Sequence, residues 1–130
     1  MNIISHGIDL VECSRLERSV NRHGKHFLDR VFTASEQRYC LDRKRNRFQS
    51  LAGRFAVKEA VMKALGTGWA KDIAWTDMEI LNEKEGRPVL NLHGKCMNIA
   101  AKLHIKTFYI SISHTDMYAV GSVIAVGEQA

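Results

Sequence analysis

Apolar and polar residues alternate close to the N-terminus, and this alternation predicts a β-strand from Asn2 to Val11. The residues expected on one face of the strand are Ile4, His6, Ile8 and Leu10, and those on the other are Ile3, Gly7, Asp9 and Val11. Asp9 stands out because a carboxylate inside such a strand is unfavourable unless its charge is matched. The strand therefore carries a first candidate for a functional side chain.

The spacing of apolar residues then becomes helical and predicts three helices, beginning at Ser14, at the capping box Thr33–Glu36 and at about Gln49. Gly24 predicts a break after the first helix. We expect only a short apolar segment over 27–32 after this break, and not a further helix. The third helix is expected to end near Leu65, because Gly66 readily adopts the left-handed conformation of a helix cap.

The second half of the chain predicts strands at Asp77–Leu81 and Pro88–Leu92, and a hairpin over 108–126 that turns at 114–116. Between them a helix from Lys95 is expected, with an inner face of Cys96, Ile99, Ala100 and Leu103. The resulting order β-α-α-α-β-β-α-β-β indicates an α+β fold in which an antiparallel sheet packs against helices, the long one among them.

Composition narrows the class of protein. The chain has 130 residues, the size of one domain spanning 1–130, and 45% of them are hydrophobic and 25% charged, as in an ordinary globular protein. It contains neither an apolar run of about 18 residues nor a secretory signal, so we expect a cytoplasmic protein without a membrane partner. The net charge of +5 indicates acidic partners without identifying them.

The three cysteines Cys13, Cys40 and Cys96 are widely separated and form no Cys-x-x-Cys pair. This spacing argues against both a disulfide framework and a zinc site, and it predicts free thiols.

The long helix carries a carboxylate where an apolar residue is expected. Helical spacing places Glu59 on the face of Ala52, Phe55 and Ala56, and Lys63, one turn further on, could pair with it. The loop Gly66-Thr67-Gly68 that follows could turn backbone N–H groups toward an anion. Two interpretations remain open for this segment: an ordinary surface pair followed by a glycine cap, or a site for a metal and a phosphate.

The strand carrying Asp9 could bring it beside Glu59, and two neighbouring carboxylates require either a shared proton or a cation. Magnesium is commonly held by two carboxylates, with water and substrate phosphate in the remaining positions. A carboxylate pair of a hydrolase is the alternative. We favour the metal site because Lys63, the loop 66–68 and His114 are groups that bind phosphate.

The basic run Arg43–Arg47 has two interpretations, a solvated turn or a site for a phosphate or an acidic protein face. A nucleic-acid-binding module would also explain the positive charge. It predicts aromatic residues interleaved with the basic ones, which this sequence lacks, and it leaves Asp9 and Glu59 without a role. We therefore expect no nucleic-acid partner.

Several motifs, in this order along nearly the whole chain, resemble those of the bacterial holo-(acyl-carrier-protein) synthases: Gly7-Ile-Asp9-Leu-Val-Glu12, Phe32-Thr-Ala-Ser-Glu36, Leu51-Ala-Gly-Arg54-Phe-Ala-Val-Lys58-Glu59-Ala-Val-Met-Lys63-Ala-Leu-Gly66-Thr-Gly68, Gly86-Arg-Pro88 and Ser111-Ile-Ser-His114. The larger phosphopantetheinyl transferases contain two such units in one chain, and this sequence has one.

The resemblance implies transfer of 4′-phosphopantetheine from coenzyme A to a serine of apo acyl carrier protein in fatty acid biosynthesis, with release of adenosine 3′,5′-bisphosphate. It implies Asp9 and Glu59 as magnesium ligands, and Glu59 and Lys63 as catalytic groups. The base that takes the serine proton stays open between Glu59 and a water on the metal.

The resemblance also implies a homotrimer with active sites at its subunit interfaces. Implied contacts to coenzyme A are Arg45, Arg47, Arg54, Lys63, Gly66, Thr67, Gly68 and, from a neighbouring subunit, His114. Arg15 and Arg22 share one face of the first helix and are expected to dock the acidic carrier protein, together with Lys25. Family members commonly have a further arginine in the stretch 22–27, where this chain has Lys or His.

Overall fold

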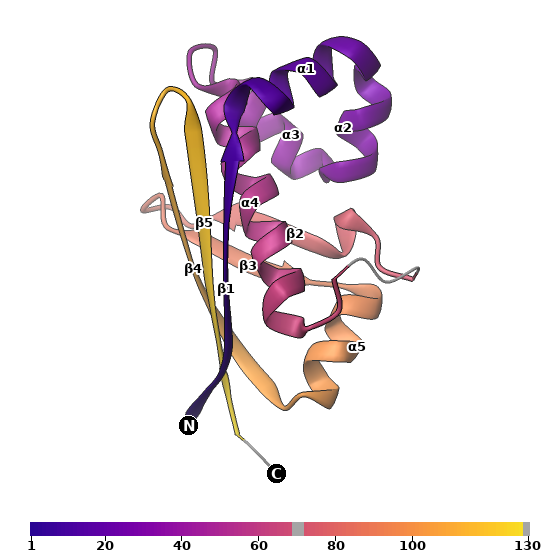
Figure 1. The fold of residues 1–130 in the computed structure, drawn as a ribbon, viewed down its shortest axis with the longest axis vertical. Coiled ribbons are helices and arrows are strands. Elements are labelled where there is room, and N and C mark those ends of the chain that lie inside the picture. The colour runs from indigo at the N-terminus through magenta and orange to yellow at the C-terminus, as the bar shows by residue number, and fades with distance from the viewer. Residues whose placement is uncertain (69–71, 129–130) are drawn as a thin grey trace.

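The long helix α4 (Arg47–Leu65) crosses one face of a three-stranded antiparallel sheet in the computed structural model, which describes residues 1–68 and 72–128. The sheet consists of β1 (Asn2–Glu12), β4 (Ile105–His114) and β5 (Tyr118–Gly127) in the order β1-β5-β4. Figure 1 shows this sheet as one layer, with α4 and the remaining elements forming the other. The predicted α+β fold is confirmed.

The close approach of α4 to the sheet depends on two glycines. A Cβ atom at Gly7 of β1 would lie 2.0 Å from the carbonyl oxygen of Ala60, and one at Gly121 of β5 would lie 2.5 Å from the backbone nitrogen of Val57. Gly121 is also the cross-strand neighbour of Asp9, so Asp9 lies on the helix-facing side of the sheet. The same two glycines that admit α4 thus bring its backbone next to Asp9.

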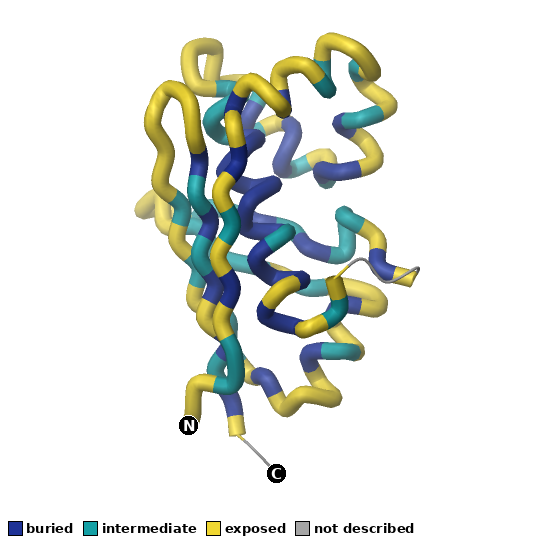
Figure 2. Tube along the Cα trace, in the orientation of Figure 1, coloured by how far each residue is buried: buried dark blue, intermediate teal, exposed yellow. Residues whose placement is uncertain are grey.

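The other elements surround α4 (Figure 1). Helices α1 (Cys13–His23), α2 (Lys25–Val31) and α3 (Ala34–Leu41) gather around its N-terminal half. The hairpin β2 (Met78–Asn82) and β3 (Pro88–Leu92) crosses behind it, preceded by the 3-10 turn Trp75–Asp77, and α5 (Gly94–Lys102) lies beyond its C-terminal end. Buried residues therefore follow α4 along most of its length (Figure 2).

A buried ion pair joins three of these elements. The Nζ of Lys58 on α4 donates to Oε1 of Glu36 on α3 at 2.7 Å, and both side chains are fully buried. Glu36 also accepts from the backbone N–H groups of Thr33 and of Ile80 in β2, each at 2.9 Å. Burial lowers the pKa of the Lys58 amine, and the charge of Glu36 opposes that change.

Most of the predicted elements are confirmed, with boundary shifts of one to three residues. The Thr33 capping box, the left-handed cap at Gly66, the strand Pro88–Leu92 and the terminal hairpin are all present. The predicted order was short by one helix, because the segment after Gly24 folds as α2. The prediction that Leu103 faces inward is wrong: Leu103 is the C-cap of α5, and the left-handed backbone of His104 (φ 60°) redirects the chain there.

Two further observations concern the state of the cysteines and the apolar content of the helices. Cys13, Cys40 and Cys96 are buried free thiols, which confirms the prediction. Among the helices within residues 1–68 and 72–128, none has the length and apolar content that a membrane span requires.

Candidate active site

Asp9, Glu59 and Lys63 meet where β1 lies against α4. The Nζ of Lys63 donates to Oδ1 of Asp9 and to the carbonyl oxygen of Ile8, both at 2.9 Å. Lys63 thus pairs with Asp9, and the expectation that it would pair with Glu59 is wrong as far as hydrogen bonds go. The strand supplies the nearer acceptors, since β1 runs alongside the helix at this point.

The environment of Glu59 disfavours its charged form. Partial burial raises the pKa of its carboxyl group, and the negative charge of Asp9 raises it further, while the charges of Arg15 and Lys63 oppose the change. The predicted repulsion between the two carboxylates is therefore present in the fold. A group that relieved it would be a cation.

The donor set fits magnesium. Within the described part of the chain, no group of three or more His, Cys, Asp or Glu side chains could hold a metal. Two carboxylates alone are nevertheless the usual protein share of a magnesium site that handles phosphate, because substrate oxygens and water complete the coordination. Asp9 and Glu59 supply that share, and Lys63 beside them adds positive charge for phosphate oxygens.

Arg15 connects this site to the surface of α1. Its guanidinium carbon lies 5.5 Å from the centre of the Phe55 ring, and its charge acts on Glu59. Arg15, Arg18 and Arg22 line a small basic hollow along α1. Lys25 on α2 pairs with Oδ1 of Asp29 at 2.9 Å, so its charge is partly offset.

A second basic pocket, of about 180 Å³, contains two of the predicted phosphate contacts, Arg54 and His114. Arg54 projects from α4 into a site where its guanidinium donates to Ser50 Oγ at 3.4 Å and to Asn82 Oδ1. His114 ends β4 on the same pocket wall. We call this group of residues, together with Tyr39, Arg43 and Asn46, the arginine pocket.

The arginine pocket and the carboxylate site are not brought together within one chain. Arg54 and Glu59 are five residues apart on α4, so they project about 140° apart around the helix axis. Neither Asp9, Glu59 nor Lys63 lines the arginine pocket. The two groups therefore lie on different sides of α4.

Not all of the basic residues predicted to contact coenzyme A lie in the arginine pocket. Arg45 is exposed in the loop before α4 and Arg47 is half-buried at its start, and the arginine pocket instead includes Arg43. Sequence reasoning missed Tyr39 as a pocket residue, and it considered Arg43 only as part of the basic run Arg43–Arg47. The available signal was that Tyr39 and Arg43 are four residues apart, on either side of the C-terminal end of α3, a spacing that places both side chains on one side of the chain.

The loop Gly66-Thr67-Gly68 caps α4. Gly66 and Gly68 both have positive φ, of 74° and 53°, and the Thr67 hydroxyl donates to the carbonyl oxygen of Gly68 at 3.0 Å. The loop starts one turn after Lys63, so it lies at the same end of α4. Its proposed contact with an anion remains a prediction.

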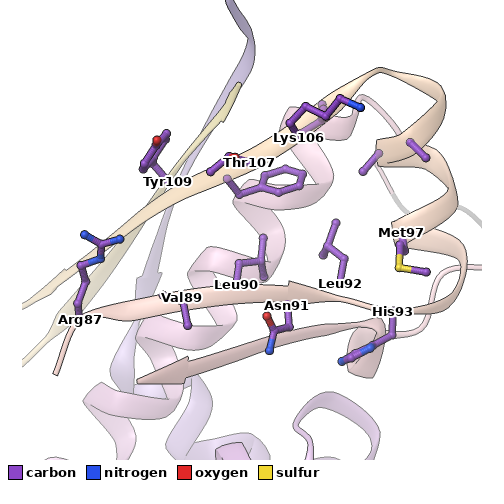
Figure 3. A pocket seen from close by; sticks show the side chains of 14 residues that line it. Arg87, Val89, Leu90, Asn91, Leu92, His93, Met97, Lys106, Thr107 and Tyr109 are labelled. Carbon is purple, nitrogen blue, oxygen red and sulfur yellow. The ribbon is translucent and has the colours of Figure 1, made fainter. Parts of the chain in front are cut away.

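A wide groove lies elsewhere on the molecule. It has a volume of about 640 Å³ between β3, α5 and β4. Figure 3 shows Leu90 and Leu92 pointing from β3 toward β4, with Arg87 and Lys106 near the ends of the groove. None of the predicted site residues lines it.

Comparisons with known proteins identify the family of the chain. The family model described as the 4′-phosphopantetheinyl transferase superfamily matches residues 5–121. The holo-[acyl-carrier-protein] synthase of Koribacter versatilis is 45% identical over 94% of this chain and 97% of its own length.

Solved structures of holo-[acyl-carrier-protein] synthases are similar to this chain over nearly its whole length. The Helicobacter pylori holo-[acyl-carrier-protein] synthase, in complex with coenzyme A, superimposes with a TM-score of 0.81 at 32% identity, covering 93% of this chain and 99% of that one. The Bacillus anthracis enzyme, in complex with CoA (3′,5′-ADP), gives 0.79 at 31% identity, covering 97% and 98%. The chain therefore belongs to the 4′-phosphopantetheinyl transferase superfamily and, within it, to the holo-[acyl-carrier-protein] synthases.

Proposed function

We propose that this protein transfers 4′-phosphopantetheine from coenzyme A to a serine of apo acyl carrier protein, as a magnesium-dependent step of fatty acid biosynthesis. The observation that carries the proposal is the juxtaposition of Asp9 and Glu59, two mutually repelling carboxylates, beside the Lys63 ammonium on a transferase scaffold. The names of the relatives, and coenzyme A in two similar structures, support the donor and the acceptor.

Asp9 and Glu59 would hold the magnesium ion, which neutralises charge on the donor pyrophosphate when it is bound. Lys63 lies 2.9 Å from Asp9 and adds a positive charge for the same phosphate oxygens. The hydrogen bond from Lys63 also limits how far the Asp9 carboxylate can move. Asp9 and Lys63 would thus orient the phosphoryl group that is attacked.

In the transfer, the serine Oγ of the carrier protein forms a bond to the β-phosphorus of coenzyme A, next to the pantetheine arm. The bond from that phosphorus to the bridging oxygen breaks, and adenosine 3′,5′-bisphosphate leaves with the electron pair. We propose Glu59 as the base that takes the serine proton. A carboxyl group with a raised pKa is a better proton acceptor, and its second oxygen remains available for the metal.

Two surfaces extend the proposal beyond one chain. The outer face of the sheet exposes Ile8, Leu10, Tyr109 and Ile124, which are 57%, 65%, 56% and 38% accessible, an apolar surface suited to a second copy. A homotrimer built through this face would allow the arginine pocket of one subunit, with His114, to complete the carboxylate site of another. The two sites would then share one molecule of coenzyme A.

The remaining parts of the proposal concern the carrier protein and the cell. Arg15 and Arg22 support docking of an acidic carrier protein beside Glu59, and Lys25 contributes less because it is paired with Asp29. We further propose that residues 1–130 act as one domain in the cytoplasm. Three buried free thiols support a reducing compartment.

The test is intact-mass spectrometry of an apo acyl carrier protein incubated with this protein and coenzyme A. We expect a mass gain of one phosphopantetheinyl group that a magnesium chelator abolishes and added magnesium restores. Asp9→Ala and Glu59→Ala variants should remain folded and show no gain. A gain that persists in chelator, or in either variant, would exclude that part of the assignment.

A further inference from the structure

Tyr39 lies against two arginines of the arginine pocket. The guanidinium carbon of Arg43 is 4.2 Å from the centre of the Tyr39 ring, and that of Arg54 is 4.3 Å from it. Arg43 also donates a hydrogen bond from Nη2 to the Tyr39 hydroxyl. One ring from α3 therefore holds a cation from the loop before α4 and a second cation from α4 itself.

The positive charge gathered there is not neutralised by a carboxylate. Among residues 1–68 and 72–128, no ion pair includes Arg43 or Arg54. Arg54 is only 4% exposed, and its acceptors, Ser50 Oγ and Asn82 Oδ1, are uncharged. A buried guanidinium without a counter-charge is unfavourable, and an anion bound in the pocket would supply that counter-charge.

Arg54 also retains an unused donor. Its Nε atom is buried and has no hydrogen-bond partner within the described residues. Buried donors are normally satisfied, and exceptions mark strain or a missing ligand. The pocket volume of about 180 Å³ leaves room for a phosphate group.

The Tyr39 ring can orient both guanidiniums. The face of an aromatic ring attracts a guanidinium, and a planar guanidinium stacked on it has a fixed orientation. Asn82 holds Arg54 from another direction, and its own Nδ2 donates to the carbonyl oxygen of Gly86 at 3.0 Å. The two guanidiniums are thus oriented before an anion arrives, which limits the ordering that binding requires.

We infer that Tyr39 is a positioning residue that orients Arg43 and Arg54 toward a phosphate of the donor, and that it sets donor affinity without acting on the reacting atoms. The inference rests on the proposed function, since coenzyme A is the ligand concerned. It assigns a role to a side chain that carries no charge.

The experiment compares Tyr39→Leu, which removes the ring, with Tyr39→Phe, which removes only the hydroxyl. Calorimetry measures binding of adenosine 3′,5′-bisphosphate, and kinetics give kcat and the KM values of both substrates. We expect Tyr39→Leu to weaken binding and raise the coenzyme A KM about tenfold, and Tyr39→Phe to change both less than about threefold. The carrier-protein KM and kcat should stay near wild type, because neither substitution touches the carboxylate site.

A second pair of variants keeps the inference testable if Tyr39→Leu fails to fold. Arg43 is exposed, so Arg43→Met should fold and should weaken binding of the bisphosphate. Adding Tyr39→Phe to Arg43→Met should then have no further effect, because the hydroxyl acts through Arg43. Unchanged binding in Tyr39→Leu, or independent effects of the two substitutions, would overturn the inference.

The failure of the proposed function would look different. In that case the wild-type protein would transfer no phosphopantetheine, whatever the Tyr39 variants bind. Wild-type transfer together with an unchanged coenzyme A KM in Tyr39→Leu would overturn only the role of Tyr39.

Discussion

Glu59 illustrates how a site residue can oppose the stability of its own fold. Burial and the neighbouring Asp9 both raise the pKa of its carboxyl group, so the charged form at neutral pH destabilises the folded protein. A raised pKa in the folded state means that the penalty is present at neutral pH and vanishes below the ordinary glutamate pKa. Removing the charge should therefore stabilise the protein while removing its activity.

We predict that Glu59→Gln raises the melting temperature at pH 7 by roughly 1–4 °C and abolishes transfer. The gain should shrink as the pH falls toward 4, because wild-type Glu59 then becomes protonated too. Thermal unfolding across this pH range, with a chelator present so that bound metal does not stabilise the wild type, provides the measurement. Glu17→Gln, at an exposed position of α1, is the matched control and should show no such gain. A destabilised Glu59→Gln at pH 7 would contradict the prediction.

Arg15 and Arg22 separate docking from chemistry. Both line the basic hollow on α1, but only Arg15 contributes to the charge balance of Glu59. We predict that Arg22→Glu raises the carrier-protein KM about five- to tenfold at low salt and leaves kcat unchanged, because rim charges mainly govern association.

Arg15→Glu should raise the same KM and also lower kcat, since it adds a negative charge near Glu59. Steady-state kinetics at two salt concentrations measure both effects, with Arg30→Glu on the exposed part of α2 as the control for net charge. A comparable rise in the coenzyme A KM for Arg22→Glu would argue against docking.

At the scale of elements, α4 organises the site because its two sides serve different purposes. Near Asp9, Gly7 and Gly121 leave no room for a Cβ and admit the helix backbone. On the other side, Lys58 is anchored to α3 and β2 through Glu36. The residue after Lys58 is Glu59, so the anchor also fixes how far Glu59 is rotated toward the strand.

We predict that Lys58→Met destabilises the protein by about 3–5 kcal/mol, because it leaves the Glu36 carboxylate buried without its cation. Combining it with Glu36→Gln should cost less than the sum of the two single substitutions, since the pair is then removed together. Urea unfolding followed by circular dichroism measures all three values. Additive losses would show that the two side chains are not coupled.

In the whole molecule, the carboxylate site and the arginine pocket lie on different sides of α4. Arg54 and Glu59 project about 140° apart on α4, and the outer sheet face exposes apolar side chains. Both features have a common explanation if copies assemble through the sheet, since one copy then supplies carboxylates and its neighbour supplies the arginine pocket.

Subunit mixing tests this explanation. Glu59→Ala and Arg54→Met should each be inactive alone, whereas co-expression of the two should restore about a quarter of wild-type activity, because random assembly pairs two intact halves at that frequency. Leu10→Lys, which charges the outer sheet face, should sediment as a monomer and abolish the effect. Mixtures as inactive as their components would place both halves in a single subunit.

The sequence alone determined the elements whose signals are local. Thr33 and Glu36 stand at the spacing of a capping box, Gly66 ends a helix, and alternation defines the terminal hairpin; each depends on residues within a few positions of one another. The prominence of Asp9 and Glu59 as candidates was equally local, because each places a carboxylate in an apolar pattern. The helix after Gly24 was missed since seven residues give periodicity too little length to register.

The partners that these residues meet depend on how the elements pack against one another. Lys63 lies next to Glu59 along the helix but pairs with Asp9, 54 positions away, and Arg43 rather than Arg45 enters the arginine pocket. The Tyr39 contacts, the burial of Lys58 and the exposure of Ile8 and Leu10 likewise depend on how elements pack. The physical reason is that periodicity gives the direction of a side chain relative to its own element, whereas packing across elements determines the groups that it faces.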